Sequence, residues 1–241
     1  MKQLTKEQRD IRRRILEISF KLKLSHLGSC FSAVDLIDSV YKHKKKSEKF
    51  VLSSGHAGIA LYAVLEKYGF IKDPKTFEKL YIHPDRNLSL DIHVSTGSLG
   101  QGLPIALGMA IATKERDVYC LISDGEATEG SIWESLRIAA DNNISNLKIL
   151  LNANGWGAYD SISINTLKRR LKAYGCTFIE VEGHDTEQIK RALEKNSGSK
   201  PLMIFAKTNV NQFPFLKDQD AHYYVMTDQD YLSALDLLLW S

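Results

Sequence analysis

The sequence predicts an α/β fold in which helices flank a mainly parallel central sheet. Short apolar runs alternate with longer amphipathic segments along the chain, as in proteins built from strand–helix–strand units. Apolar residues make up 44% of the 241 positions, which is enough for one sizeable core. No repeat, low-complexity tract or Pro/Gly-rich linker divides the chain. We therefore expect a single domain over residues 1–241.

The N-terminal part is expected to be mostly helical. Residues 5–23 carry isoleucines and leucines at steps of four, three and four from Ile11 to Leu22, which is the spacing of one helix face. A second helix is expected over residues 32–41, with Ser32 as its cap and Asp35 three residues on. The further elements expected here are a strand over 50–52, a helix over 57–67, a polar loop over 82–93 and a Gly- and Ala-rich helix over 99–114.

The C-terminal part alternates strictly between strand and helix patterns. Thr227 and Asp230 stand three residues apart before the last apolar stretch, as in a capping box, and predict a final helix. The other expected elements are strands over 118–122, 147–151, 177–181 and 202–207, and helices over 131–142, 165–173 and 185–196.

Charge and cysteine content exclude several classes of protein. The chain has 32 basic and 29 acidic residues, so nothing favours binding of nucleic acid or of a membrane surface. The basic run from Lys42 to Lys46 is interpreted as a solvated helix end. No uncharged apolar segment approaches roughly 18 residues, and the N-terminus has no signal-like apolar region. Cys30, Cys120 and Cys176 have no metal-binding spacing and indicate free thiols in a reducing cytoplasm.

Asp124 and Asn154 are the strongest candidate ligands in the chain. Each follows an apolar β-like run, and the carboxyl ends of parallel strands open on the same crevice. A carboxylate and a carboxamide brought together there are hard oxygen ligands suited to Mg²⁺ or Ca²⁺, and Mg²⁺ commonly holds phosphate oxygens as well. Asp-Gly and Asn-Gly are also common turn dipeptides, so the residues alone leave a plain turn equally open.

The stretch containing both residues resembles the cofactor motif of the transketolase family. It reads S-D-G-E-A-T-E-G-S-I-W-E from Ser123 and N-A-N-G-W-G from Asn152, and the E-G-x-x-W-E part is typical of transketolases. The resemblance extends over nearly the whole chain. Further matching segments are S-H-L-G-S at 25–29, L-S-S-G-H-A at 52–57, V-S-T-G-S-L-G-Q-G at 94–102, E-G-H-D at 182–185 and F-x(6)-H at 215–222.

This resemblance implies a three-layer thiamine diphosphate-binding fold and a set of cofactor contacts. Asp124, the Asn154 side chain and the Trp156 carbonyl would bind Mg²⁺, with Ca²⁺ or Mn²⁺ as substitutes. Gly125 and His56 would approach the diphosphate, although a capping or turn role for His56 is the structural alternative. The remaining implied contacts are Gly97 at the aminopyrimidine, Leu99 in the apolar wall, and Glu129 in an acidic network at a subunit contact.

The resemblance also implies three catalytic histidines. His26, His83 and His222 match family positions that contact the donor sugar or move protons, and a neutral imidazole can accept a hydroxyl proton near pH 7. A lone histidine is more often structural, so this alternative stays open for each. Glu126 is expected to be solvated or a cap. His43, His93 and His184 are expected to be non-catalytic.

Only the diphosphate-binding part of a transketolase is matched. The chain is therefore expected to be the N-terminal subunit of a split transketolase that transfers a two-carbon ketol unit from a ketose to an aldose. Its partner would be a C-terminal subunit carrying the pyrimidine-binding domain, in a heterotetramer, with sugar phosphates as substrates. Ser123 replaces a glycine, which is compatible with the motif if its φ is negative. Two further departures bear on substrate contacts and specificity: His93 replaces an acid, and the loop after Asn154 is shortened.

Other functions stay open on the sequence. Within thiamine chemistry they are 1-deoxyxylulose-5-phosphate synthase and a carboligase or decarboxylase acting on 2-oxoacids or specialised sugars. A non-catalytic scaffold subunit is a different class, but both Asp124 and Asn154 are present. A dinucleotide-binding domain is disfavoured because no G-x-G-x-x-G follows the first strand. A free-standing metal hydrolase is weak because no second carboxylate or histidine pair has ligand spacing.

Overall fold

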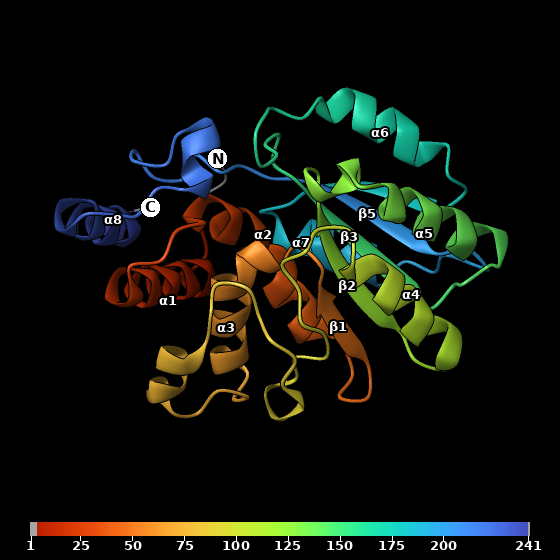
Figure 1. Ribbon diagram of the computed structural model, residues 1–241, viewed down its shortest axis with the longest axis horizontal. Coiled ribbons are helices and arrows are strands. Elements are labelled where there is room, and N and C mark those ends of the chain that lie inside the picture. Colours follow the sequence, from red (N-terminus) through yellow and green to blue (C-terminus); the bar gives the residue numbers. More distant parts are fainter. Residues whose placement is uncertain (1–3, 241) are drawn as a thin grey trace.

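A five-stranded sheet forms the middle layer of the structure, a computed structural model that describes residues 4–240 (Figure 1). Its strands are all parallel and lie in the order β1-β2-β3-β5-β4. Because both faces are covered, β2 and β3 are buried along their whole length, which explains their continuous apolar runs. The strands are β1 (Lys49–Leu52), β2 (Val118–Ser123), β3 (Leu147–Ala153), β4 (Thr177–Glu182) and β5 (Leu202–Lys207).

Helices cover both faces of this sheet, so the predicted three-layer α/β fold is confirmed (Figure 1). One core packs the sheet against α4 (Gly102–Ala112), α5 (Gly130–Asp141) and α6 (Ile164–Lys172). The core of the other face contains α2 (Leu27–His43), α3 (Gly58–Lys67) and α7 (Thr186–Leu193). Outside this layer, α1 (Lys6–Leu22) packs on α2 and α3, and α8 (Asp228–Trp240) packs on α1.

Local sequence signals fix the starts of two helices, and the predicted capping box is one of them. Thr227 and Asp230 exchange the hydrogen bonds of a capping box before α8, because each backbone N–H donates to the other side chain. Asp185 accepts hydrogen bonds from the backbone N–H groups of Glu187 and Gln188 and thereby caps α7. None of the helices in the described part of the chain is both long and apolar enough to cross a membrane.

Two predicted helix starts are wrong. Ser32 does not cap α2; the helix begins at Leu27, and the Ser32 hydroxyl donates within it to the Ser29 carbonyl oxygen at 3.0 Å. The N-cap is His26, whose left-handed backbone (φ 65°) carries no sequence signal of a helix start. Helix α4 begins at Gly102 rather than at residue 99, since a turn with positive φ at Gly100 precedes it.

The interpretation of the basic run as a solvated helix end is wrong for Lys44. Its side chain is only 4% exposed, and its Nζ lies 3.0 Å from Asp91 Oδ2. Asp91 also lies 3.0 Å from His93 Nε2, so His93 pairs with a neighbouring acid in the loop between α3 and α4. This loop contains only short 3-10 helices, in agreement with the irregular segment predicted over 82–93.

Candidate functional site

Asp124 and Asn154 lie at the carboxyl ends of adjacent strands, as the sequence predicts. Strands β2 and β3 pair in register up to Ser123 and Asn152, and the Asp124 N–H donates to the Asn152 carbonyl oxygen at 3.1 Å. The Asp124 side chain then reaches across to the segment after β3, where its Oδ2 accepts the Gly155 N–H at 2.6 Å. The two residues therefore share one corner of the sheet edge.

The Asp124 carboxylate is fully buried. Burial raises its pKa to about 7, even though hydrogen bonds from the backbone N–H groups of Gly155 and Gly125 act in the opposite direction. A cation beside this carboxylate would stabilise its ionised form. The buried acid is therefore suited to bind a metal.

Asn154 and Trp156 supply further oxygens at this corner. Asn154 Oδ1 accepts the Trp156 N–H at 2.9 Å. A Cβ added to Gly125 would lie 2.9 Å from the Gly157 Cα and 3.6 Å from the Trp156 carbonyl oxygen, so only glycine permits this approach. Residues 4–240 contain no group of three or more His, Cys, Asp or Glu residues that could hold a metal. One carboxylate with amide and carbonyl oxygens is nevertheless the donor set of a Mg²⁺ that also binds phosphate and water.

Four histidines gather at the same edge of the sheet. The ring centroid of His26 lies 5.9 Å from that of His56 and 6.1 Å from that of His83, and the rings of His56 and His222 are 6.3 Å apart. Burial lowers the pKa of His56 to about 3 and that of His26 to about 4, with additional repulsion from neighbouring histidines. Burial also lowers the pKa of His222. Burial therefore favours the neutral form of these three imidazoles.

Several buried polar atoms around this cluster lack a hydrogen-bond partner within the described residues. Unpaired polar atoms are expensive inside a protein, so a group of them is a candidate position for a bound ligand. The unpaired atoms of the cluster and of the adjoining turn are His26 Nδ1, His222 Nδ1 and Thr96 Oγ1.

The turn that contains Gly97 and Leu99 borders the histidine cluster. Gly97 has φ 139°, and an added Cβ would lie 2.9 Å from His83 Cγ. Leu99 is half-buried beside it. Glu129 is exposed at the start of α5, where a Cβ added to Gly100 would lie 2.8 Å from its Cβ. The structure thus brings these predicted site residues to one edge of the sheet.

The expectation that Glu126 is solvated or a helix cap is wrong. Its side chain is fully buried, and its Oε1 accepts hydrogen bonds from Ser53 Oγ at 2.6 Å and from the Gly100 N–H at 2.8 Å. Burial raises the pKa of this carboxyl. The residue fixes the turn before α4 to the end of β1, a contact between distant segments that local sequence does not reveal.

The shortened loop after Asn154 is held by residues that no local sequence pattern singles out. Gln219 Nε2 donates to the carbonyl oxygens of Gly157 and Ala158 at 2.9 and 2.7 Å, and the Tyr223 hydroxyl donates to that of Ala158 at 2.8 Å. The Tyr223 ring also lies 5.9 Å from His26. The loop beside the candidate metal corner is therefore tied to the segment that carries His222.

The fold and this site define a thiamine diphosphate-binding α/β domain. The family model described as the thiamine diphosphate binding domain of transketolase matches residues 11–230, and the chain belongs to this family. It is 34% identical to human transketolase over 211 residues, which are 76% of this chain and 33% of that protein. It is also 31% identical over 226 residues to the 6-deoxy-6-sulfo-D-fructose transketolase subunit SqwG of a Clostridium species, covering 82% of each chain.

Solved transketolases share the fold. The structure of the Campylobacter jejuni enzyme superposes with a TM-score of 0.84 at 24% identity and covers 96% of this chain and 42% of the other. That of Leishmania mexicana gives a TM-score of 0.86 at 23% identity, covering 98% and 42%. The chain thus spans about a third of the length of the mammalian relatives and less than half of these solved chains.

Proposed function

We propose that this chain is the diphosphate-binding subunit of a thiamine diphosphate- and Mg²⁺-dependent transketolase, which moves a two-carbon ketol unit from a ketose to an aldose. The proposal is carried by one observation: the candidate metal ligands and the histidine cluster share one edge of the sheet in a chain of this family. There the oxygens of Asp124, Asn154 and Trp156 lie at the ends of neighbouring strands, and an unsatisfied histidine cluster occupies the same edge.

The residues of this edge fit the cofactor. Asp124, Asn154 Oδ1 and the Trp156 carbonyl would hold Mg²⁺, because all three are hard oxygen donors. Gly125 leaves the backbone open to a diphosphate, and His56 would face the same group. Gly97 and Leu99 would line the rings of the cofactor, and Glu129, which is exposed, would face the partner subunit.

Thiamine diphosphate supplies the nucleophilic carbon and the electron sink that such a transfer requires. The histidines would handle the protons of the sugar. His26 and His222 each bury an unpaired Nδ1, and burial favours their neutral form, so a ring nitrogen that carries no proton would accept a hydrogen bond or a proton from a hydroxyl of a bound ketose. His83, which is exposed above them, would contact the sugar from the open side.

A second polypeptide would complete the enzyme. As a single domain over 1–241, the chain would pair with a pyrimidine-binding subunit in a heterotetramer, a proposal supported by the relative named as a transketolase subunit, which matches over 82% of both chains. Ile105 and Ile111 are 41% and 46% exposed on α4, which suits a contact with such a partner. The cysteines of the described part are free thiols, as expected in a reducing cytoplasm.

The donor could be a modified sugar rather than an ordinary sugar phosphate. The relative named as a 6-deoxy-6-sulfo-D-fructose transketolase subunit matches over 82% of both chains, so its length and this one correspond. A sulfonated ketose therefore belongs beside fructose 6-phosphate and xylulose 5-phosphate in the substrate panel. The carboligation of 2-oxoacids is the thiamine-dependent alternative for the same panel.

The test is reconstitution. The chain is purified from its host in Mg²⁺ and thiamine diphosphate, co-purifying subunits are identified by mass spectrometry, and ketol transfer is assayed with the panel. We expect stoichiometric recovery of a pyrimidine-domain subunit and transfer that Asp124→Asn abolishes, because the metal loses its charged ligand. Recovery of the chain alone, without cofactor, would refute the proposal and favour a scaffold role. Unchanged cofactor affinity of Asp124→Asn in calorimetry would refute the ligand assignment.

A further inference from the structure

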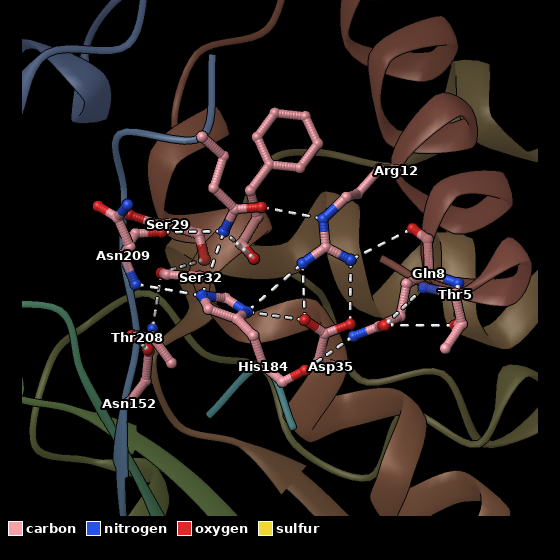
Figure 2. A network of polar contacts seen from close by, with 12 residues as sticks. Thr5, Gln8, Arg12, Ser29, Ser32, Asp35, Asn152, His184, Thr208 and Asn209 are labelled. Carbon is pink, nitrogen blue, oxygen red and sulfur yellow. Dashed lines mark hydrogen bonds and ion pairs between the residues drawn. The ribbon is translucent and has the colours of Figure 1, made fainter. Parts of the chain in front are cut away.

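Ser32 lies at the junction between α2 and the end of β3, where its hydroxyl meets two asparagine side chains. Asn152 Nδ2 donates to Ser32 Oγ at 2.9 Å, and Asn154 Nδ2 approaches the same oxygen at 3.3 Å. Both asparagines lie on the α2 side of the sheet, because residues two apart on a strand face the same way. Figure 2 shows Ser32 between Ser29 and Asn152, inside a larger polar network.

The hydrogen-bonding capacity of the Ser32 hydroxyl is fully used. A serine hydroxyl has one hydrogen and two acceptor lone pairs. Its hydrogen goes to the Ser29 carbonyl oxygen at 3.0 Å, within the same helix. Only acceptor positions then remain, so the hydroxyl can receive the NH₂ end of an amide and cannot donate to an amide oxygen. Ser32 is 0% exposed, so its hydroxyl is shielded from bulk solvent.

The orientation of Asn152 leaves one acceptor position of Ser32 for Asn154. The Thr208 hydroxyl donates to Asn152 Oδ1, which directs the NH₂ group of Asn152 toward Ser32. The remaining lone pair receives Asn154 Nδ2. At the other end of that amide, Oδ1 accepts the Trp156 N–H. The Asn154 amide is thus fixed at both ends, with its nitrogen against α2 and its oxygen on the Trp156 side.

We propose that Ser32 is a positioning residue for the metal corner: it holds the nitrogen of Asn154 against α2 and thereby presents Oδ1, the only end of the amide that can bind a cation. The inference rests on the proposed function, because it requires Asn154 to be a metal ligand. An amide that rotates would offer its NH₂ group to Mg²⁺ and lose a coordinate bond. Residues that orient a metal ligand in this way typically contribute about 10- to 100-fold to metal affinity.

Helix α2 is rigid enough at this point to serve as the reference. One turn beyond Ser32, Asp35 receives two hydrogen bonds from the Arg12 guanidinium, at 3.0 and 2.6 Å, and lies 2.7 Å from His184 Nδ1 (Figure 2). Asn209, next to Thr208 in the chain, donates its N–H to His184 Nε2. The same network therefore connects α2 with the segment after β5 that orients Asn152.

The test measures the Mg²⁺ affinity of Ser32 variants and of the wild type by calorimetry. The sample is the complex with the partner subunit, in saturating thiamine diphosphate. Ser32→Ala removes the hydroxyl, and Ser32→Cys fills its space with a weak acceptor. We expect both to weaken Mg²⁺ binding about tenfold, because the Trp156 N–H still holds the other end of the amide. Ser39→Ala, a buried serine on the same helix, is the matched control and should bind Mg²⁺ like the wild type.

The outcomes distinguish the ligand role of Asn154 from the positioning role of Ser32. Asn154→Ala with unchanged Mg²⁺ affinity would refute the ligand assignment, and the positioning role of Ser32 with it. Asn154→Ala that weakens binding, together with a Ser32→Ala that does not, would overturn the positioning role alone. If Ser32→Cys binds Mg²⁺ like the wild type while Ser32→Ala does not, the residue acts by filling space and the inference is wrong. Melting temperatures without ligand show whether any variant is misfolded.

Discussion

Two buried polar regions lie close together on the α2 side of the sheet, and they treat their polar atoms in opposite ways. In the network of Arg12, Asp35 and His184, the guanidinium also donates to Gln212 Oε1 and to the Gln8 carbonyl oxygen. In the histidine cluster, buried nitrogens of His26 and His222 have no partner among residues 4–240. Both regions are buried, but only in the network of Arg12, Asp35 and His184 do the polar atoms find hydrogen-bond partners.

The difference indicates that the network of Arg12, Asp35 and His184 stabilises the fold as a brace, whereas the histidine cluster is a candidate ligand site. Burial alone would raise the pKa of Asp35, but Arg12 and the hydrogen bond from His184 hold it below its ordinary value. The pKa values of His26 and His56 fall because burial and repulsion from neighbouring histidines lower them, and no acidic partner acts in the opposite direction. A histidine in a family motif is thus insufficient to identify a site, since His184 belongs to the brace.

The largest effect is expected from breaking the brace. Arg12→Ala would leave the Asp35 carboxylate buried without its cation, and such losses cost about 3–5 kcal/mol. Urea denaturation would measure this as a fall in the free energy of unfolding. A loss below about 1 kcal/mol would mean that the network does not brace the fold.

Removing an imidazole from the histidine cluster should lower turnover and leave stability nearly unchanged. His26→Asn keeps a residue that tolerates the left-handed backbone and removes the imidazole. We expect ketol transfer by the reconstituted enzyme to fall about 100-fold or more, as for loss of a general base. The melting temperature should change little. A variant that melts much earlier and retains its turnover would assign His26 to the structural class.

The two regions should lose stability in different pH ranges. His26 and His56 have folded pKa values below their ordinary 6.5, so the unfolded chain binds more protons and stability falls as the pH drops from 6.5 toward 4. We expect a loss of about 2 kcal/mol for each of the two histidines, or about 4 kcal/mol together, between pH 7 and pH 5 in urea titrations. Asp35, whose folded pKa is lowered, contributes stability that is lost only below its unfolded pKa of about 4. A flat profile between pH 7 and pH 5 would contradict the neutral cluster.

The smallest effect is expected at Arg14, which serves as the control for Arg12 on the same helix. Arg14 also makes a bidentate pair, with Glu66 at 2.5 and 2.9 Å, but its side chain is 30% exposed. Solvent screens such pairs, so Arg14→Ala should cost at most about 1 kcal/mol. Equal losses for Arg12→Ala and Arg14→Ala would show that burial does not distinguish the two pairs.

Regular elements were predictable because their signals are local. The apolar runs of β2 and β3 and the capping box of Thr227 and Asp230 depend on residues a few positions apart, and the structure has each of them. The prediction for the start of α2 was wrong because the signals that define it are not local. Its N-cap is defined by the backbone angle of His26 and by a hydrogen bond from its N–H to the distant His222 carbonyl oxygen.

Within the site, the motif residues were predictable and their supports were not. Asp124 and Asn154 follow strand-like runs, which suffices to place them at one edge. Glu126, Ser32 and Gln219 act through segments far away in the chain, and Arg12 finds Asp35 only after α1 packs on α2. Asn152 near the end of β3 and Asn154 just beyond it are two residues apart, and this spacing is the one local signal that both side chains point toward α2.

The left-handed backbone of His26 limits what this position can become. Glycine and asparagine suit φ 65° with little strain, whereas β-branched residues are strongly disfavoured there. Neither of the tolerated residues supplies an imidazole. In a library that samples all substitutions at residue 26, selection for folding and selection for turnover should therefore retain almost separate sets of variants.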